Sequence, residues 1–571
     1  MRLVLPSASL LRTLFLSVLG LSAACGDDDT QTTGGTGGQH PSGGNGGQGG
    51  QVEPMCTVDP PSVPVIVAPT SGARDVVEAS LTITLDGFSA AAGATFAGAD
   101  VELYSVKDGV PNNLVWSGAI ADSASALSIT LAEGTWQNAV TALDPYQDYA
   151  VRARFKATDG DCVTTGEFSD YSIFLTDDGS AYLFDPSVVR DIYIDIPPES
   201  WDLINAQAGP PGCVPYHRDY YTATLHFEGQ DFPGVGLHIK GGCGSARDLN
   251  GKASFKINLN WDDPAIPGCP EERRLYGQKH LTLNNGVQDA SATHERLAYS
   301  IYRQMGVPSA RLAHVRVFVN GQLWGLYQHV ETYDRRFLER WFGSNKGMLY
   351  EGTYWCDLLP QNLPPDGSDN YCLTREFAND VCDTADPTEE PTDYSKLTEL
   401  VNQIAALPPG GFYDGVKTFF DFDRFLTSWA IESYIAHWDA YEFYIQNNYR
   451  VYHDPSTNLW TYLSSGIDQT FGGDLDPWGV GGVLAARCLE EPACEAAFVD
   501  KLKLVKQTVA SMSLPETATQ IHDQIAPYVA EDPRKEYDVG TWESQQQSLQ
   551  SFLAWRPSSI DQYIVNHGYT P

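Results

Sequence analysis

The period of the hydrophobic pattern changes along this chain, and this change constrains the fold more than any other feature. From Cys56 to about residue 180, apolar and polar residues alternate in short runs, as in SLTITL from Ser80 and YAVRARF from Tyr149. A period of two is typical of half-buried strands, and this spacing predicts a β-sandwich. From residue 188 onward such runs are mixed with runs at helical spacing, which predicts an α+β region. Several domains are expected, because 571 residues exceed the usual single domain of about 50 to 250 residues.

The N-terminus has the pattern of a secretory signal. Arg2 and Arg12 precede an apolar run over residues 14–21, which is too short for a good membrane span. The ending Ala23-Ala24-Cys25 resembles a bacterial lipobox. We therefore expect residues 1–25 to be a lipoprotein-type signal, with export and a lipid anchor at Cys25 on the outer membrane or cell surface. Secretion without an anchor is the alternative.

Composition limits the partners of the chain. Lys and Arg total 36 against 73 Asp and Glu, a formal charge of −37, which opposes nonspecific attraction to nucleic acid or anionic lipid. We expect no nucleic-acid partner, and membrane contact through the lipid anchor alone. Residues 26–55 are rich in Gly, Thr and Gln with almost nothing to bury, so they predict a flexible linker.

The cysteines predict disulfides. With Cys25 assigned to the anchor, ten of the eleven cysteines remain, and in an exported chain an even number indicates as many as about five disulfides with open connectivity. Zinc is the competing interpretation, but the sequence has no C-x-x-C and no His pair at ligand spacing.

One segment of the predicted sandwich is similar to a known module. The phrase LDPYQDYAVRARF, from Leu143 to Phe155, resembles a fibronectin type III or related immunoglobulin-like domain. In such domains a corner tyrosine precedes an alternating strand, and Tyr149 matches that tyrosine. Residues 56–180 offer no residue with a chemical role, so the expected role of this module is spacer or binding module.

The next region predicts two hairpins around one helix. VGLHIK (235–240) and KASFKINLN (252–260) alternate and are joined by the glycine-rich GGCGSARDLNG. ATHERLAYSIYRQMG reads as a helix that stops at Gly306. VRVFVNGQLWGLYQHV contains Asn320-Gly321, one of the strongest hairpin signals. These elements predict a small sheet-plus-helix lobe.

A second constellation follows a buried helix, DFDRFLTSWAIESYIAHWD. After Asp439, the sequence predicts a hairpin with strands 448–453 and 459–464. A hairpin brings the start of its first strand beside the end of its second, so Asn448 and Asp468 are expected to meet near Asp439. An Asp, an Asn and a second Asp suit phosphoryl transfer, with a carboxylate for the attacking hydroxyl and hard oxygen ligands for magnesium.

The first lobe offers a complementary half. Backbone N–H groups of a glycine-rich loop can approach phosphates, and Lys252 or Lys256 could neutralise them. Glycine also serves ordinary turns, so this loop alone is weak support. Together with the distant Asp, Asn and Asp, it indicates metal–nucleotide chemistry.

Several separated motifs, in order, resemble the bacterial spore-coat protein kinase family called CotH. The resemblance covers about 300 residues and rests on VGLHIKGGCGS…KASFKINL, LTLNNGVQDASATHERLAYSIYRQMGVPSARLAHVRVFVNGQLWGLYQHVETYDRRFL and HWDAYEFYIQNNYRVY…GIDQTFGG. It implies an atypical, bilobal protein-kinase-like fold over residues 188–571. It also implies ATP and Mg²⁺ or Mn²⁺ as cofactors, and transfer to Ser or Thr of a protein substrate on the cell surface or in the periplasm.

The resemblance assigns roles around the predicted hairpin. Asp439 matches the catalytic Asp of the family, Asn448 matches a metal-binding Asn, and Asp468 matches the second Asp of W-D-x-D-x-T-F-G. Here Ser465-Gly466 replaces the Trp-Asp of that motif. If the missing Asp is the principal metal ligand, activity is crippled.

Four further residues are implied as nucleotide contacts. Lys240 stands where the family often has Arg before its G-N-S loop, and Lys252 and Lys256 match a K-x-S-[YF]-K segment. Lys256 is favoured over Lys252 as the phosphate lysine because it lies within the strand. Glu331, in HVETYD, matches an acidic position expected near the nucleotide or the lysine.

Structural alternatives remain open for these residues. Asp439 could cap or pin a loop and Asp468 could serve a turn, while Glu331 and Lys240 could be ordinary ion-pair or solvated residues. His437 and His294 are expected to be hydrogen-bonded structural residues, and Trp429 and Trp438 to lie in the core. Two rival functions stand beside the kinase. One is a pseudokinase that acts as a surface scaffold, and the other is an adhesion or matrix protein.

Overall fold

A computed structural model describes most of the chain from residue 59 onward. The described residues are 59–107, 109–124, 126–160, 162–208, 218–261, 273–342, 345–363, 372–376 and 394–571. The predicted signal and linker, with Cys25, lie outside them. Residues 56–571 belong to one compact unit. Within the described ranges, no helix combines the length and apolar character that a membrane crossing requires.

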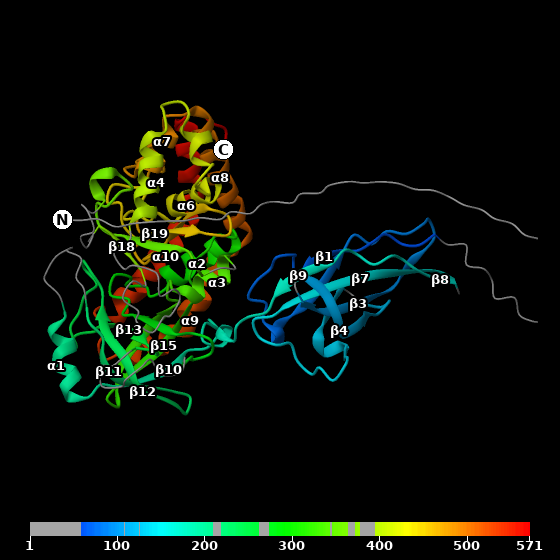
Figure 1. Cartoon of the computed structure of the whole chain (residues 1–571), viewed down its shortest axis with the longest axis horizontal. Helices are drawn as coiled ribbons and strands as arrows, with labels where there is room; N and C mark the ends of the chain where they lie inside the picture. The colour runs from blue at the N-terminus through cyan, green and yellow to red at the C-terminus, as the bar shows by residue number, and fades with distance from the viewer. Residues whose placement is uncertain are drawn as a thin grey trace, which may run out of the picture. The chain divides into compact units, whose positions relative to one another are not determined.

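The N-terminal part is a two-sheet β structure, as predicted. A three-stranded sheet has the order β1-β2-β5, and a larger sheet has the order β6-β4-β3-β7-β8 with β9 also paired to β7. Figure 1 shows β3, β4 and β7 side by side. The strands are β1 (Val65–Ala68), β2 (Thr82–Asp86), β3 (Thr95–Lys107), β4 (Val110–Ile120), β5 (Ser128–Thr130), β6 (Thr135–Trp136), β7 (Asp148–Asp159), β8 (Cys162–Thr165) and β9 (Ser172–Leu175).

Alternation along β7 explains how the two sheets pack. Val151 and Phe155 point into a core shared with Ile83 of β2 and Ile129 of β5, so both sheets bury one face against each other. The Asp144 N–H donates to the Tyr149 hydroxyl oxygen at 2.9 Å, which is the kind of contact expected of a corner tyrosine. Membership of the fibronectin type III family remains a prediction.

The two predicted hairpins belong to a closed barrel, which corrects the small sheet-plus-helix lobe. Seven strands close in the order β10-β11-β12-β13-β14-β16-β15. Closure depends on parallel pairing of β10 with β15, from Arg190↔Val315 to Ile194↔Val319. A contact so distant in sequence leaves no local signal. The strands are β10 (Arg190–Asp195), β11 (Tyr221–Phe227), β12 (Gln230–Lys240), β13 (Ser254–Asn258), β14 (His280–Asn284), β15 (Leu312–Val319) and β16 (Gln322–Val330).

The hairpin and helix signals within the barrel region are confirmed. Strand β12 pairs with β13 up to Lys240↔Ser254, and Leu237 and Ile257 are among the buried apolar side chains inside the barrel. Asn320 and Gly321 have φ of 49° and 75°, as a tight turn between β15 and β16 requires. Helix α1 (Pro198–Ala206) precedes β11, and helix α2 (His294–Gln304) ends before Gly306.

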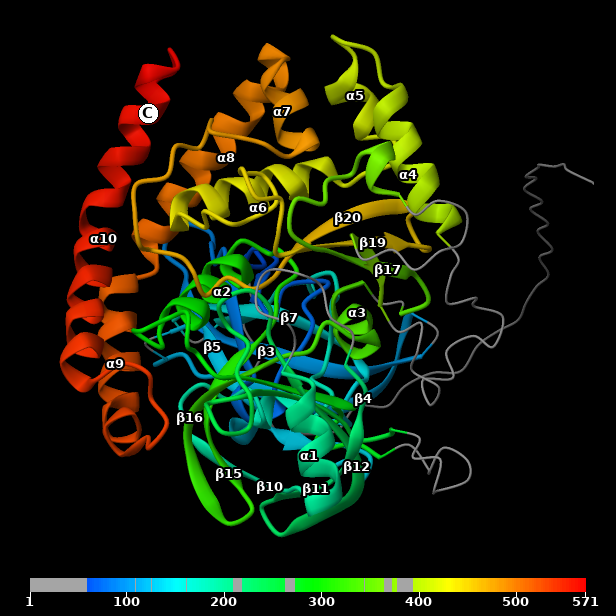
Figure 2. The ribbon, with the colours of Figure 1, turned by 90° about the vertical axis from the view of Figure 1, so that its left-hand side faces the viewer.

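A four-stranded sheet and helices follow the barrel. The sheet order is β18-β17-β19-β20, and Figure 2 shows α9 and α10 running side by side along one flank. The strands are β17 (Met348–Gly352), β18 (Leu373–Arg375), β19 (Tyr449–Asp454) and β20 (Leu459–Ser464). The helices are α3 (Arg335–Phe342), α4 (Ser395–Ala406), α5 (Phe412–Val416), α6 (Phe422–Ile435), α7 (Val483–Leu489), α8 (Pro492–Ser511), α9 (Leu514–Glu531) and α10 (Val539–Asn566), and the short 3-10 helices are η1 (Glu78–Ser80), η2 (Leu131–Glu133), η3 (Ser180–Tyr182) and η4 (Pro360–Asn362).

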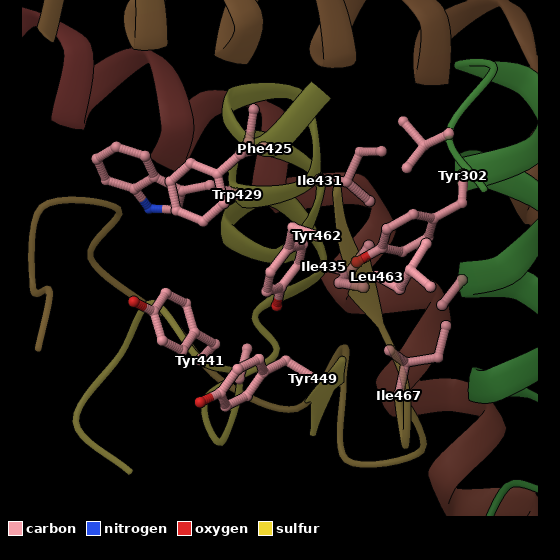
Figure 3. Close-up of a cluster of buried hydrophobic side chains, with 14 of the residues drawn as sticks. Tyr302, Phe425, Trp429, Ile431, Ile435, Tyr441, Tyr449, Tyr462, Leu463 and Ile467 are labelled. Atoms are coloured by element: carbon pink, nitrogen blue, oxygen red, sulfur yellow. The ribbon is translucent and has the colours of Figure 1, made fainter. Parts of the chain in front are cut away.

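Helix α6 is buried, as its sequence predicts. Its first turn is capped by Asp421, whose side chain accepts from the Arg424 N–H, and Trp429 has no exposed surface. Figure 3 shows aromatic side chains of α6, including Phe425, gathered with tyrosines of the following loop and hairpin. This packing holds the hairpin β19–β20 against α6 and thereby orients the loop between them.

Disulfides are confirmed for the described cysteines. Cys356 bonds to Cys372 and Cys488 to Cys494, and Cys162 and Cys243 are also disulfide-bonded. Cysteines 56, 213, 269 and 382 lie outside the described residues.

Candidate functional site

Asp439 lies on the loop that leaves α6. The helix ends at Ala436, whose φ of 55° is left-handed, and the His437 N–H donates to Glu432 O at 2.9 Å. The turn buries His437 and Asp439 but leaves Trp438 between them 47% exposed. The expectation that Trp438 lies in the core is therefore wrong, because the sharp helix end rotates it outward.

The hairpin brings Asn448 to Asp439, as predicted. Ser465 N–H donates to Asn448 O at 2.9 Å and closes the open end of β19–β20. Asn448 Nδ2 then donates to Asp439 Oδ2 at 2.9 Å. Gln469, which the sequence analysis missed, donates to the same oxygen at 3.3 Å. One carboxylate oxygen is thus held by two amides, which orients the carboxyl group.

Asp468 lies in the same charged neighbourhood. Burial raises the pKa of its carboxyl group to about 7, and repulsion from Asp439 and Asp289 adds to the effect, while His437 opposes it. Gln469, the residue after Asp468, donates to Asp439 Oδ2 at 3.3 Å, which places Asp468 beside the Asp439–Asn448 pair. The structure therefore brings all three residues of the predicted Asp, Asn and Asp set together.

Asp439 belongs to a buried row of charged side chains that also contains His437 and Glu432. His437 Nε2 lies 3.2 Å from Asp439 Oδ1, and His437 Nδ1 lies 3.6 Å from Glu432 Oε1. Burial alone would lower the pKa of His437, but these two carboxylates outweigh it and raise the pKa to about 10. His437 was expected to be a hydrogen-bonded structural residue, and the structure places it between the carboxylates of Asp439 and Glu432.

Gly466 occupies a conformation that a side chain would strain. Its φ is +59°, and a Cβ built on it would lie 2.5 Å from Asn448 Oδ1. Asn448 thus occupies the space that the first Asp of the family motif would need. The local backbone conformation therefore favours glycine over aspartate at position 466. As a result, the site has one acidic side chain fewer than the family motif.

The residues that fit a divalent cation are few. Within the part of the chain that the structure describes, no three His, Cys, Asp or Glu side chains are grouped to hold a metal ion by themselves. Asp468 and the Asn448 Oδ1 atom beside Gly466 supply hard oxygen donors. Such a set suits Mg²⁺, which commonly binds through one or two carboxylates together with substrate phosphates.

Lys240 is linked to an acid that the sequence analysis missed. Its ammonium group donates to Asn284 Oδ1, and Asn284 Nδ2 donates to Glu295 Oε2 at 3.3 Å. Burial raises the pKa of Glu295 to about 8, with repulsion from Asp468 adding and attraction from Lys240 opposing. An acidic residue in the first turn of α2 was the available signal, but such residues ordinarily serve the helix itself.

Lys256 faces a different group of charges. Burial opposes its charge, but Tyr220 and the carboxylates of Glu376 and Glu351 outweigh burial and raise its pKa. Glu351 is paired with Arg450 at 2.6 Å. Within the described ranges, no hydrogen bond or ion pair holds the Lys256 ammonium group, and its charge is stabilised by these neighbouring groups.

Lys252 and Glu331 lie in other pairs. Lys252 Nζ donates to Asp532 Oδ2 at 2.7 Å, and this Asp also accepts from the Leu326 N–H. Glu331 is paired with Arg311 at 2.8 Å and with Arg340. Although burial raises the pKa of Glu331, the two guanidinium groups lower it overall. Neither residue contacts Asp439, Asn448 or Asp468 in the structure.

The glycine-rich loop between β12 and β13 bonds to itself. Gly242 N–H donates to Ser245 Oγ at 3.1 Å, and Ala246 N–H donates to Gly242 O at 3.0 Å. Gly241 and Gly244 have φ of 116° and 81°, a region that favours glycine. The loop is therefore a turn with defined structure whose glycines are needed by the backbone itself.

Comparisons with known proteins identify relatives of this region. A profile of the family described as CotH kinase protein matches residues 237–560. The chain is 28% identical over 274 residues to invasin CotH2 of Rhizopus delemar, covering 45% of this chain and 42% of the invasin. It is 21% identical over 314 residues to inner spore coat protein H of Bacillus subtilis, covering 52% of this chain and 80% of the relative. The chain thus spans less than half of the invasin that it matches.

Proposed function

This chain belongs to the CotH kinase protein family, and from that membership we propose that it is a metal-dependent protein kinase of bilobal, kinase-like fold. It transfers the γ-phosphate of ATP to a serine or threonine hydroxyl. The observation that carries the proposal is the hydrogen-bonded pair Asp439–Asn448 beside Asp468 at the mouth of one hairpin. This is the combination that positioning of a hydroxyl and of phosphates requires.

The proposed step assigns each side chain one task. Asp439 accepts a hydrogen bond from the substrate hydroxyl and then its proton, as the hydroxyl oxygen bonds to the γ-phosphorus. The bond from that phosphorus to the bridging oxygen breaks, and ADP leaves. Asn448 and Asp468 hold Mg²⁺ or Mn²⁺, which when bound offsets phosphate charge. Lys256 pairs with a phosphate oxygen.

Two features support this division of tasks. His437 lies against the Asp439 oxygen that is not held by amides, at 3.2 Å, so a cation fixes the far side of the carboxylate. Lys252 is already neutralised by Asp532 at 2.7 Å, which favours Lys256 as the phosphate ligand. Lys240, Asn284 and Glu295 form a chain of hydrogen bonds. This chain supports the part of the site that contains Asp468.

The proposed setting is outside the cytoplasm. The disulfides of the described cysteines suit an oxidising compartment, and the N-terminal sequence suits export with a lipid anchor at Cys25. The proposed partner is a protein substrate on the cell surface or in the periplasm.

One observation favours a second candidate, a pseudokinase that acts as a surface scaffold. Gly466 replaces an acidic position of the family motif, and Asn448 occupies the space that its side chain would need. With one negative charge fewer, the cation is held less tightly. A protein of this kind would bind nucleotide or a partner without phosphoryl transfer.

Transfer from labelled ATP tests the proposal. The full mature chain is incubated with γ-labelled ATP, Mn²⁺ or Mg²⁺, and a mixed serine and threonine peptide library. Asp439→Asn should lower transfer by about 10²–10⁴-fold, the usual contribution of a general base. Lys256→Met should raise the KM for ATP, and Arg154→Ala on the distant sandwich serves as the matched control.

Two outcomes decide between the candidates. Unchanged transfer by Asp439→Asn would contradict the assignment of the acceptor base. Thermal stabilisation by ATP and Mn²⁺ without transfer in the wild-type chain would support the pseudokinase, because a ligand selective for the native state raises its apparent stability. Absence of both would reject nucleotide chemistry.

A further inference from the structure

The most exposed aromatic side chains of the described residues gather on two loops beside Asp439. Tyr444, Trp355 and Trp438 are 79%, 59% and 47% exposed, ahead of every other exposed aromatic in the described ranges. Leaving a large aromatic side chain in water forgoes about 1.5–3 kcal/mol of burial energy. Three on adjoining loops indicate a surface that is covered by a partner.

The two loops are held to each other and to the core. Trp355 N–H donates to Ile445 O at 2.7 Å. The Tyr449 hydroxyl donates to Cys356 O at 2.6 Å, and Cys356 is disulfide-bonded to Cys372. The backbone beside Trp355 and Tyr444 is therefore anchored by hydrogen bonds and a disulfide.

This surface borders the acceptor carboxylate directly. Trp438 precedes Asp439 in the chain, and consecutive Cα atoms lie about 3.8 Å apart. Tyr354, next to Trp355, lies near both acids, since burial and then the Asp439 and Asp468 carboxylates raise its pKa. These exposed rings therefore lie on the loops that carry Asp439 and its neighbours.

We propose that Trp355, Trp438 and Tyr444 form a docking surface for the polypeptide substrate, selecting large apolar side chains next to the phosphorylated Ser or Thr. This inference rests on the proposed kinase function and specifies its substrate class. Rigid aromatic rings bind apolar side chains with little loss of conformational entropy, which is why they dominate protein–protein contacts.

Charge favours a polypeptide over a bilayer as the occupant. Exposed Trp and Tyr also occur where proteins meet lipid interfaces. However, the formal charge of −37 repels anionic lipid headgroups. A peptide with apolar side chains carries no such penalty.

Kinetics with designed peptides test the surface. The probe is a set of peptides with one central serine in a Gly and Ala background, in which one flanking position is Gly, Leu, Phe or Trp. The wild-type full chain should show a KM about tenfold lower for the apolar peptides than for the Gly peptide. Tyr444→Ala and Trp355→Ala should abolish most of that difference with little change in kcat. Trp555→Ala, an exposed tryptophan on α10, is the matched control and should keep it.

Peptide binding without ATP separates this inference from the kinase proposal. Fluorescence anisotropy of the same peptides should show the same ranking and the same loss in Tyr444→Ala and Trp355→Ala. Binding that ranks as expected without any transfer would reject the kinase and keep the docking surface. Transfer to all peptides with equal KM would keep the kinase and overturn the docking surface.

A vesicle arm addresses the lipid alternative. Sedimentation with vesicles of phosphatidylcholine, and of phosphatidylcholine with phosphatidylglycerol, is expected to show no loss of binding in Tyr444→Ala or Trp355→Ala. Vesicle binding that depends on these two residues, with no peptide preference, would overturn the proposal in favour of a membrane contact.

Discussion

The N-terminal sandwich and the region that follows it differ in how deeply they bury charged side chains. On the sandwich, the charged residues of β3 and β7 pair on the outer face, as in Arg154–Asp100 at 3.0 Å with side chains 37% and 23% exposed. The following region instead buries Glu295, Glu432, Glu442 and Asp439. Burying a charge costs several kcal/mol unless it is compensated. The larger region therefore carries a cost in stability that the sandwich avoids.

The buried charges of the larger region fall into two kinds. Lys252–Asp532 and Glu331 with its arginines are paired at hydrogen-bond distance and serve the structure. Asp468 and Glu295 have raised pKa values, because burial disfavours their charged forms and repulsion between like charges adds to the effect. A cation or a phosphate-bound metal would relieve that repulsion, and this distinguishes a candidate site from a structural ion network.

The largest expected effect is loss of a structural buried pair. Asp532→Ala leaves the Lys252 ammonium, whose side chain is 8% exposed, without its partner. We expect unfolding free energy to fall by about 3–5 kcal/mol, measured by chemical denaturation. The double variant Lys252→Met with Asp532→Leu should recover most of the loss. A double variant no more stable than Asp532→Ala would show that the charge is not the cause.

A side chain at Gly466 should have the next largest effect. In Gly466→Ala the left-handed φ of +59° and the contact with Asn448 Oδ1 should cost about 1–3 kcal/mol. The displaced Asn448 should also lower any transfer activity. The control is Gly473→Ala, since a Cβ there has no atom within 4 Å. Equal stability of the two variants, measured by thermal unfolding, would contradict the geometry of Gly466.

Asp468→Asn should stabilise the protein without ligand at alkaline pH. The folded-state pKa of about 7 exceeds the ordinary value of about 4. Between these values the folded state binds more protons than the unfolded state, so stability falls as pH rises through that window. The variant should remove this pH-dependent loss of stability, while abolishing any transfer.

Thermal unfolding at pH 5 and pH 8 checks the prediction for Asp468→Asn. Asp414→Asn, whose side chain is 93% exposed, is the control and should change little. If Asp468→Asn is less stable than the wild type at pH 8, the carboxylate is compensated in the folded state and the comparison with paired charges fails.

The smallest effect is expected on the sandwich. Arg154→Ala removes a partly exposed pair and should cost about 0.2–1 kcal/mol, less at high salt. Denaturant unfolding at low and high ionic strength measures the difference. A loss near that of Asp532→Ala would mean that the two regions do not differ in how they use charge.

Local signals predicted much of the fold and part of the site. The strands predicted at 448–453 and 459–464 are β19 (Tyr449–Asp454) and β20 (Leu459–Ser464), because alternation and the turn residues specify a hairpin within one short segment. The predicted hairpin correctly placed Asn448 next to Asp439. The same reasoning missed Glu295, which lies on the distant segment α2. It also missed Gln469, which directly follows Asp468 but whose hydrogen bond to Asp439 depends on the tertiary fold.

The sequence by itself determined the strands, the hairpins, the buried helix and the family of this chain, because these depend on neighbouring residues and on motifs in order. Only the tertiary structure decided that two hairpins close into a barrel, and that Lys252 pairs with Asp532 while Lys256 faces Tyr220, Glu376 and Glu351. It also decided that Trp438 faces solvent and that Asn448 occupies the space beside Gly466. Each of these depends on the distance between groups far apart in the chain, and electrostatic and packing energies vary with that distance.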